Sequence, residues 1–340
     1  MNWNEFFEAV DARAVPPVCL FVGSEAYVKR EALERLRRTL PPGLETLNEA
    51  VLEGATARQI TEAAETMPMM CARRVVVVRD WAPLMSGKSK NEDEEVAVME
   101  RWLDNPPASC ALIFYMREEP DARKKMTALL KKKAVVVEFA PLSDGELAKW
   151  AGARLRKQGK KISRQALAEL TFMAGRELTR LSGELDKLAA YLGEERVEIC
   201  PEDVYEIVSA SLEYNTYELV NHLISGDMMK AQQLINSLIQ GGQNPVAILG
   251  MLTRQVRQLT HMKCALEEGG AVQDVQNTLK MHPYAAKQTA RQCAKLSAAW
   301  LTGLYERCVE AEFAVKSGRL RERDALDSLV LQIGLAAERN

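Results

Sequence analysis

The sequence predicts an α/β domain over residues 1–140, followed by a small helical domain over 141–210 and an all-α domain over 211–340. Short apolar runs alternate with helical patterns in the first part of the chain: Val18–Val22, Arg74–Val78, Ala111–Met116 and Ala134–Phe139. Strands that are apolar throughout are buried on both faces, which is typical of a parallel sheet covered by helices. After Pro141 the strand pattern ends, and we expect only helices.

Helix starts and stops divide the rest of the chain. Ser143 and Glu146 form a capping-box pattern at the start of the second domain. Ser209–Asn215 is the expected linker to the third domain, and Gly241–Pro245 is expected to end one helix and begin the next. The expected helices lie near Arg164–Ala174, Glu177–Leu192 and Pro201–Ser209, with a longer series from Tyr217 onward.

Composition excludes several classes of protein. No apolar run approaches the roughly 20 residues that a membrane span requires, and the N-terminal residues do not form a cationic, apolar secretion signal. Seven scattered cysteines without a C-x-x-C pair argue against a disulfide framework and a zinc ribbon. The net charge of −2 gives no general attraction to DNA or to an acidic membrane. We therefore expect a cytoplasmic protein with reduced cysteines and no membrane partner.

A degenerate phosphate-binding loop follows the first predicted strand. A working loop reads G-x-x-x-x-G-K-[ST], in which backbone N–H groups surround phosphates and a hydroxyl holds magnesium. Gly23 and Lys29 fall in register, but Val28 stands at the second glycine and Arg30 at the hydroxyl. A β-branched residue resists the positive φ that glycine supplies, and Arg cannot ligate a cation. We therefore expect a nucleotide-binding scaffold without a nucleotide and without a cofactor.

Other catalytic signals are also missing. With the loop degraded, Lys29 is interpreted as a solvent-facing lysine rather than a phosphate ligand. In a working site the second apolar strand is followed by a magnesium-binding Asp, but Val75–Val78 is followed by Arg79. The histidines lie on separate helical segments without acidic or cysteine partners at ligand spacing: His222, His261 and His282. We expect neither catalytic residues nor a metal site.

The segment before the second apolar strand is the strongest candidate for a binding element. Pro68 lacks an amide donor and disfavours helix at Met67, so the helix Thr56–Glu65 should end there and expose a turn. Met69 and Met70 lie in that turn. Two interpretations are open on the residues alone: the methionines fill the core of the first domain, or they bind a partner.

The segment Pro120–Lys133 carries six Lys and Arg residues against one Asp, which suggests nucleic-acid binding. Met126, Leu129 and Leu130 nevertheless fall at helical spacing on one face. The favoured interpretation is that the charges line a solvated face, with direct DNA contact as the alternative.

Five fragments, in order, resemble the delta subunit of the bacterial DNA polymerase III clamp loader. They are GSEAYVKREALERLR, MPMMCARRVVVVRD, PDARKKMTALLKKKAVVVEF, ELTRLSGELDKLAAYLGEERVEICPEDV and EAEFAVKSG. The resemblance implies an AAA+-like first domain with a degenerate loop, a small helical lid and a helical collar. It also implies a protein that binds a ring-shaped sliding clamp and helps open it during DNA replication without hydrolysing ATP.

The resemblance also implies the site and the partners. The residues that would bind the clamp are Pro68, Met69, Met70 and Cys71, with Met-Met in place of the family's usual Leu-Phe-like pair. The implied partners are the sliding clamp (beta subunit), the ATPase subunits gamma and tau, delta-prime, and primer–template DNA through the assembled complex. The chain would have no catalytic site of its own, although the holoenzyme is a DNA-directed DNA polymerase. Two alternatives stay open: a weakly active P-loop ATPase, and a free-standing DNA-binding regulator.

Overall fold

The computed structural model describes residues 1–87, 91–279, 281, 283–294 and 296–337. They form two compact units, Met1–Glu146 and Leu147–Asn340. The division into three domains stays a prediction. No described helix combines the length and the apolar character that a bilayer span needs.

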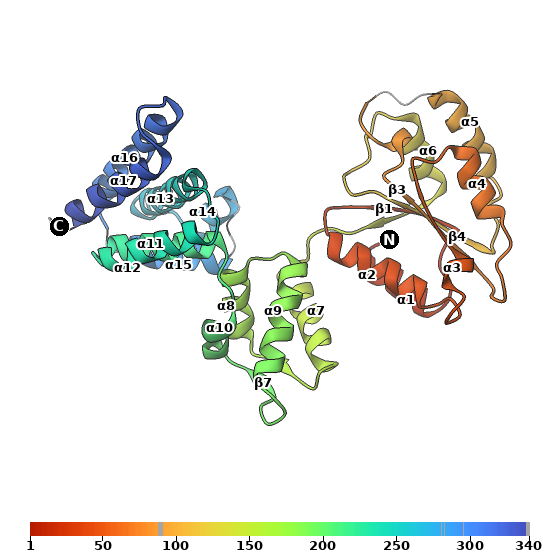
Figure 1. The fold of residues 1–340 in the computed structure, drawn as a ribbon, viewed down its shortest axis with the longest axis horizontal. Helices are drawn as coiled ribbons and strands as arrows, with labels where there is room; N and C mark the ends of the chain where they lie inside the picture. The colour runs from red at the N-terminus through yellow and green to blue at the C-terminus, as the bar shows by residue number, and fades with distance from the viewer. Residues whose placement is uncertain (88–90, 280, 282, 295, 338–340) are drawn as a thin grey trace. The chain divides into compact units, whose positions relative to one another are not determined.

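The first unit is built on a parallel five-stranded sheet with the order β2-β3-β4-β1-β5 (Figure 1). The strands are β1 (Val18–Val22), β2 (Glu49–Glu53), β3 (Arg74–Arg79), β4 (Cys110–Tyr115) and β5 (Val135–Glu138). The helices are α1 (Trp3–Asp11), α2 (Ala26–Arg37), α3 (Glu45–Asn48), α4 (Ala57–Glu65), the 3-10 turn η1 (Ala82–Leu84), α5 (Glu92–Trp102) and α6 (Lys125–Lys133).

Helices cover both faces of this sheet, as its apolar strands predicted. On one face, α4, α5 and α6 bury Ile60, Met99 and Leu130 against the sheet, while α1 and α2 lie on the other face (Figure 1). Phe6 of α1 meets Phe21 of β1 edge-on, with ring centroids 5.0 Å apart. The prediction of an α/β first domain is confirmed.

One strand of the sheet lies outside the sequence prediction. The edge strand β2 pairs with β3 in the register Val51↔Val77. Its sequence, Glu-Ala-Val-Leu-Glu, carries a charge at each end and is only partly buried, so it lacks the continuous apolar run that marks the other four strands. A charged, half-exposed strand is typical of a sheet edge.

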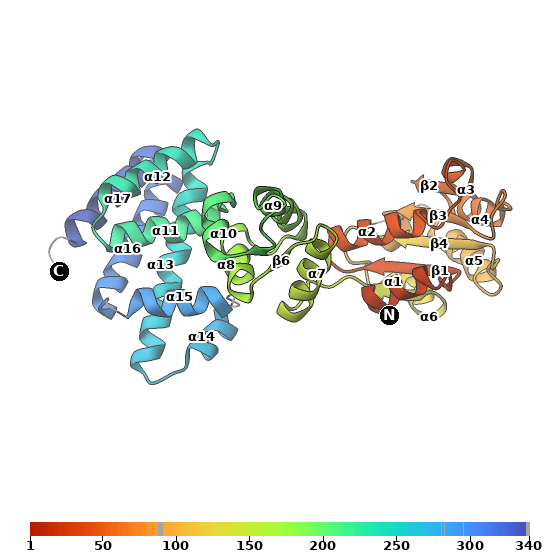
Figure 2. The ribbon, with the colours of Figure 1, turned by 90° about the horizontal axis from the view of Figure 1, so that it is seen from below.

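The second unit is helical, with one short parallel strand pair that the sequence prediction did not include. The pair consists of β6 (Lys161–Ile162) and β7 (Glu198–Ile199). The helices, visible in Figure 2, are α7 (Asp144–Arg156, which begins at the end of the first unit), α8 (Arg164–Ala174), α9 (Leu178–Tyr191), α10 (Pro201–Ile207), α11 (Leu212–Ile224), α12 (Met228–Gln240), α13 (Pro245–Glu267), α14 (Val272–Leu279), α15 (Pro283–Cys293), α16 (Ala298–Lys316) and α17 (Glu322–Ala337).

Two helix starts test the sequence prediction. The capping box at Ser143 is confirmed, because the Ser143 amide donates to Glu146 Oε2 at 2.9 Å. The expected linker Ser209–Asn215 is wrong in its second half. α11 begins at Leu212, where the Ser211 hydroxyl accepts the Tyr214 amide and caps the helix.

The turn after β1 depends on a glycine. Gly23 has φ +98°, and a Cβ atom at this position would lie 2.3 Å from the carbonyl oxygen of Phe139. The backbone at Phe139 is fixed from both sides, since its amide donates to Val22 O and its carbonyl accepts the Glu25 amide. Any side chain at residue 23 must therefore push two hydrogen-bonded segments apart.

We predict that Gly23→Ala destabilises the first unit far more than Gly43→Ala. Both glycines have positive φ, but a Cβ at Gly43 meets nothing within 4 Å. Gly43→Ala should therefore cost only the backbone strain of about 1–2 kcal/mol, and Gly23→Ala should cost at least about 2 kcal/mol more through the clash. Urea unfolding measures both values. Equal losses would contradict the close approach at Phe139.

Candidate functional site

The turn Thr66–Arg74 between α4 and β3 exposes three methionines. α4 ends at Glu65, as Pro68 predicted. The exposed fractions are 78% for Met67, 54% for Met69 and 84% for Met70. The interpretation that Met69 and Met70 fill the core is therefore wrong. Three large apolar side chains that lie together in solvent indicate a surface for a partner.

A buried asparagine fixes the backbone of this turn. Asn48, at the end of α3, is fully buried, and its carboxamide makes two hydrogen bonds with Met69. The Met69 amide donates to Asn48 Oδ1 at 2.7 Å, and Asn48 Nδ2 donates to Met69 O at 2.9 Å. The same Nδ2 also donates to Leu44 O at 3.1 Å. Hydrogen bonds to Asn48 thus hold both the amide and the carbonyl of Met69, while its side chain is exposed.

Two arginines close the base of the turn. Arg73 donates from Nε to Ala108 O at 2.8 Å and from Nη2 to Cys110 O at 3.1 Å, which ties it to the start of β4. Arg74 is buried and donates from Nη1 to Thr66 O at 3.3 Å, across the mouth of the turn. The base is therefore rigid while the apex faces solvent.

The apex carries backbone strain. Met70 has φ +56°, a left-handed conformation that costs a residue with a Cβ about 1–2 kcal/mol. Such strain persists where the surroundings over-determine the backbone, and it is concentrated at functional sites. Of the other predicted site residues, Pro68 and Cys71 are half-buried, and Cys71 Sγ lies 3.2 Å from Arg73 O. They shape the turn, whereas Met69 and Met70 form its exposed surface.

Sequence reasoning missed the surroundings of the turn. Leu47 of α3 and Val51 of β2 are 52% and 48% exposed, which adds apolar surface on the elements that hold Met69. A pocket of about 460 Å³ also lies beside the turn. Its walls include Met70, Arg73 and the segment after α2, which contains Leu40. Neither feature has a local sequence signal, because each joins segments that are far apart in the chain.

The degenerate phosphate loop is closed by groups of the protein itself. The Gly23 amide donates to Glu119 Oε1 at 2.7 Å, and the Glu25 amide donates to Phe139 O at 3.0 Å. In a working loop such N–H groups bind phosphate oxygens. Here the Glu119 carboxylate takes the place of a phosphate at the Gly23 amide. Val28 is buried in α2, and Arg30 is exposed on the same helix.

The prediction that Lys29 faces solvent is wrong. Its side chain is only 1% exposed, and Nζ donates to Met116 O, just beyond β4, at 2.6 Å. Burial lowers the pKa of Lys29 below its usual value, while the carboxylates of Glu119 and Asp80 act in the opposite direction. Lys29 therefore joins α2 to the end of β4, and its amine points at a carbonyl oxygen rather than at an anion site.

The end of β3 offers no magnesium ligand of the expected kind. Arg79 is exposed and lies 3.6 Å from Glu53 on β2. The Asp80 carboxylate accepts the Arg117 amide at 2.8 Å and pairs with Arg117 Nε at 2.9 Å. Within the described residues, no group of three or more His, Cys, Asp or Glu side chains could hold a metal ion. His282 lies outside the described residues.

The basic segment of α6 is largely neutralised by acidic neighbours. Lys124 and Lys125 pair with Glu92 and Asp93 at the start of α5, at 2.7 and 2.8 Å, and Lys133 pairs with Asp104. Met126 and Leu130 are fully buried, while Leu129 is partly buried. This arrangement agrees with a helix that turns its apolar stripe inward and its charges to solvent.

The fold and the loop together define a class of protein. It is an α/β domain with a parallel sheet, whose loop after β1 is closed by the Glu119 carboxylate and the Phe139 carbonyl, joined to a helical unit. Two family models match the chain: "DNA polymerase III, delta subunit" over residues 20–140, and "DNA polymerase III delta subunit, C-terminal domain" over residues 213–333. The chain belongs to the family of DNA polymerase III delta subunits.

Individual relatives agree with this assignment, and two of the comparisons extend over nearly the whole chain. DNA polymerase III subunit delta of Bacillus subtilis is 28% identical over 331 residues, which is 96% of this chain and 95% of the relative. A probable delta subunit of Aquifex aeolicus is 24% identical over 58% of this chain and 56% of the relative. The solved structure of the Bacillus subtilis DNA clamp loader delta protein is 26% identical, with a TM-score of 0.60 over 98% of this chain and 99% of that one.

We predict that ATP with magnesium does not bind at the β1–α2 loop. The backbone amide resonances of Gly23 and Glu25 should stay unshifted when ATP is added, because both amides already donate to protein acceptors. Glu119→Ala frees the Gly23 amide but leaves Val28 and Arg30 in place. It should therefore lower the free energy of unfolding by about 0.5–1.5 kcal/mol without creating an ATP site. Saturable shifts at these amides in the unmodified chain would contradict the closed loop.

Proposed function

We propose that this chain is a clamp-loader delta subunit that binds a ring-shaped sliding clamp, helps hold one interface of the ring open, and does not hydrolyse ATP. One observation carries the proposal: Met69 and Met70 are exposed on a turn whose backbone is anchored by Asn48. Membership in the DNA polymerase III delta family supports the choice of partner.

The turn is suited to insert into an apolar pocket. Methionine is unbranched and polarizable, so it adapts to the shape of a pocket, although it loses more side-chain entropy than an aromatic residue would. The fixed backbone at Met69 offsets part of that cost, because only side chains need to be ordered on binding. Full burial of one Met side chain contributes roughly 1.5–3 kcal/mol. Met69 and Met70 together therefore act as the anchor of the contact.

Ring opening requires a difference in affinity. A protein shifts the equilibrium between closed and open clamp only by as much as it binds the open form more tightly. The chain supplies no energy from ATP, and its turn acts as a ligand of the clamp. The ATP state of neighbouring subunits governs whether Met69 and Met70 are accessible.

The proposed assembly places ATPase subunits of the gamma and tau type and delta-prime beside the region 211–340, and primer–template DNA inside the complete complex. Exposed apolar side chains in this region support a contact with neighbours. Phe313 is 56% exposed on α16, Leu320 is 42% exposed after it, and Leu331 is 63% exposed on α17.

The observations disfavour both rival functions. A weakly active P-loop ATPase needs loop amides and a lysine directed at phosphate, but Gly23 donates to Glu119 and Lys29 to Met116. A free-standing DNA-binding regulator needs a field of unpaired cations, whereas Lys124, just before α6, and Lys125 and Lys133 of α6 pair with acidic side chains.

We predict that the double change Met69→Ala and Met70→Ala weakens clamp binding at least about tenfold, because a few buried side chains supply most of the energy of an interface. The melting temperature should barely change, since both side chains are exposed. Surface plasmon resonance with the sliding clamp and a thermal melt measure the two effects. Met229→Ala is the matched control, because Met229 is 74% exposed on α12 in the other unit. Unchanged clamp affinity in the double variant would place the docking element elsewhere.

A second variant tests the contact between Asn48 and the Met69 backbone without changing the methionines. Asn48→Ala keeps Met69 and Met70 but leaves the Met69 amide and carbonyl without their partner. We predict a loss of clamp affinity of several fold, because the turn must be ordered on binding, together with faster hydrogen exchange at the Met69 amide. The buried change Ile113→Val in β4 controls for a general loss of about 0.5–1.5 kcal/mol in stability. Equal effects of the two variants on clamp affinity would show that Asn48 acts only through stability.

A further inference from the structure

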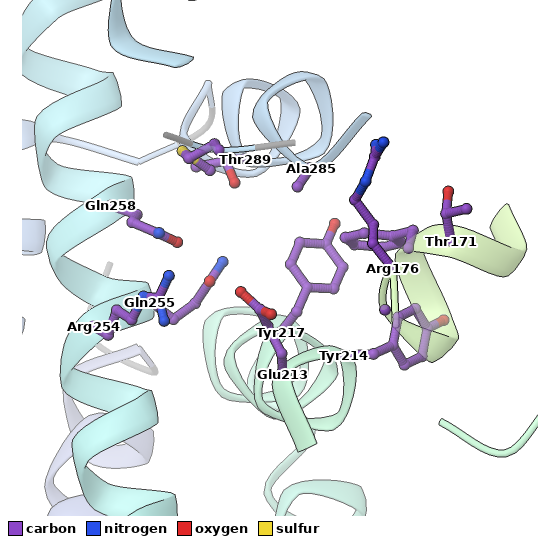
Figure 3. Close-up of a pocket in the computed structure, with 13 residues that line it drawn as sticks. Thr171, Arg176, Glu213, Tyr214, Tyr217, Arg254, Gln255, Gln258, Ala285 and Thr289 are labelled. Atoms are coloured by element: carbon purple, nitrogen blue, oxygen red, sulfur yellow. The ribbon is translucent and has the colours of Figure 1, made fainter. Parts of the chain in front are cut away.

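A second pocket lies within the helical unit and shares no residue with the turn Thr66–Arg74. Its volume is about 490 Å³, within the range of about 300–1,000 Å³ that is usual for small-molecule sites. The ends of α8 and α11 form one wall, and α13 and α15 form the other (Figure 3). All of its walls belong to the unit Leu147–Asn340.

Two buried carboxamides point into this pocket. Gln255 and Gln258 on α13 are 9% and 8% exposed, and both extend from the helix towards Tyr217 (Figure 3). Neither carboxamide hydrogen-bonds to another described residue, and neither is sealed from solvent, so both are open to a molecule in the pocket. Two such amides, one turn apart and directed into one cavity, indicate a ligand with donors and acceptors on one edge.

The opposite wall is aromatic. Phe172 at the end of α8 contacts Tyr214 and Tyr217 of α11 edge-on, with ring centroids 5.2 and 5.1 Å apart. This packing holds the rings in place, and all three line the pocket. The Tyr217 ring rises between the two walls (Figure 3). A flat heteroaromatic ring could stack here while its edge meets the amides.

Charged groups lie around the aromatic wall and the amides. Arg254 is exposed on α13 and lines the pocket one turn before Gln258. Arg176, just beyond α8, lines the opposite side, and the Glu213 carboxylate at the start of α11 is the acidic group among the lining residues. The guanidinium of Arg254, exposed at the rim of the pocket, favours an anionic ligand. Guanidinium binds phosphate with two parallel hydrogen bonds.

We propose that this pocket binds a nucleotide, with the base between Tyr217 and the two glutamines and the phosphate at Arg254. Glutamine makes a bidentate contact with the donor and acceptor of adenine, and aromatic side chains stack on unpaired bases. The chemistry favours adenine with a phosphate. It fits either a free mononucleotide or one nucleotide of a single DNA strand. The proposal does not rest on the clamp contact, since no pocket residue belongs to the turn Thr66–Arg74.

The test uses the full chain and two probes, dAMP and a labelled single-stranded oligo-dA of about 15 nucleotides. Fluorescence anisotropy follows the oligonucleotide, and calorimetry follows dAMP. The key variant is Gln255→Leu with Gln258→Leu. Replacing unpartnered amides with apolar groups of similar size should leave the melting temperature unchanged or raise it. The affinity for the bound probe should nevertheless fall at least about tenfold.

Two arginines on α13 give a matched pair. Arg254 lines the pocket, whereas Arg257 is exposed on the same helix but is not part of the lining. Arg254→Gln should weaken binding several fold and reduce its salt dependence, because one phosphate contact is lost. Arg257→Gln should leave the affinity within about twofold. If Arg254→Gln and Arg257→Gln lower the affinity for the probe equally, only general positive charge matters, and the proposal is wrong.

The outcomes separate the two sources of the ligand. If dAMP binds and the double Leu variant weakens that binding, the site is a mononucleotide site. If only oligo-dA binds and the variant weakens it equally, the ligand is a single DNA strand. The proposal is wrong if neither probe binds at about millimolar concentration, or if the Leu variant binds as the unmodified chain does. If the double variant does not fold, Gln255→Leu and Gln258→Leu are measured singly by the same criteria. No clamp is present, so failure here leaves the clamp proposal untouched.

Discussion

The pair of hydrogen bonds between the Asn48 carboxamide and the Met69 backbone is the contact on which the proposed binding surface depends. Large apolar side chains normally collapse onto the nearest core, because burial is favourable. At Thr66–Arg74 they do not, since Asn48 fixes Met69 from below and Arg74 joins the two ends of the turn. The side chain of Met70, whose backbone is left-handed, is then 84% exposed. The same contact ties α3 and the edge strand β2 to the start of β3.

The loop after β1 is ordered by contacts within the protein. A phosphate normally satisfies the loop amides and the lysine. Here each of those groups has an internal substitute: the Glu119 carboxylate serves Gly23, and Met116 O accepts from Lys29. These contacts connect β1 and α2 to the segment after β4. The fold therefore needs no nucleotide to order the loop.

Most of the first unit could be predicted from the sequence, because four of its strands are continuous apolar runs and Pro68 marks the end of α4. The edge strand β2 escaped prediction since its charges hide the strand pattern. The partners of the site were not predictable for a physical reason. Asn48 and Met69 are 21 residues apart, and Gly23 and Glu119 are 96 apart. Only the folded topology brings them together, and for the same reason the burial of Lys29 contradicted its sequence interpretation.

The most direct test of the account is methyl NMR of the chain labelled at methionine ε-methyl groups, titrated with the sliding clamp. Exposed methyls that enter an apolar pocket change their environment, whereas buried or distant ones do not. The account predicts that Met69 and Met70 shift or broaden on binding, while Met99 in the core and Met229 on α12 keep their positions. Binding of the clamp with unshifted Met69 and Met70 signals would contradict the account.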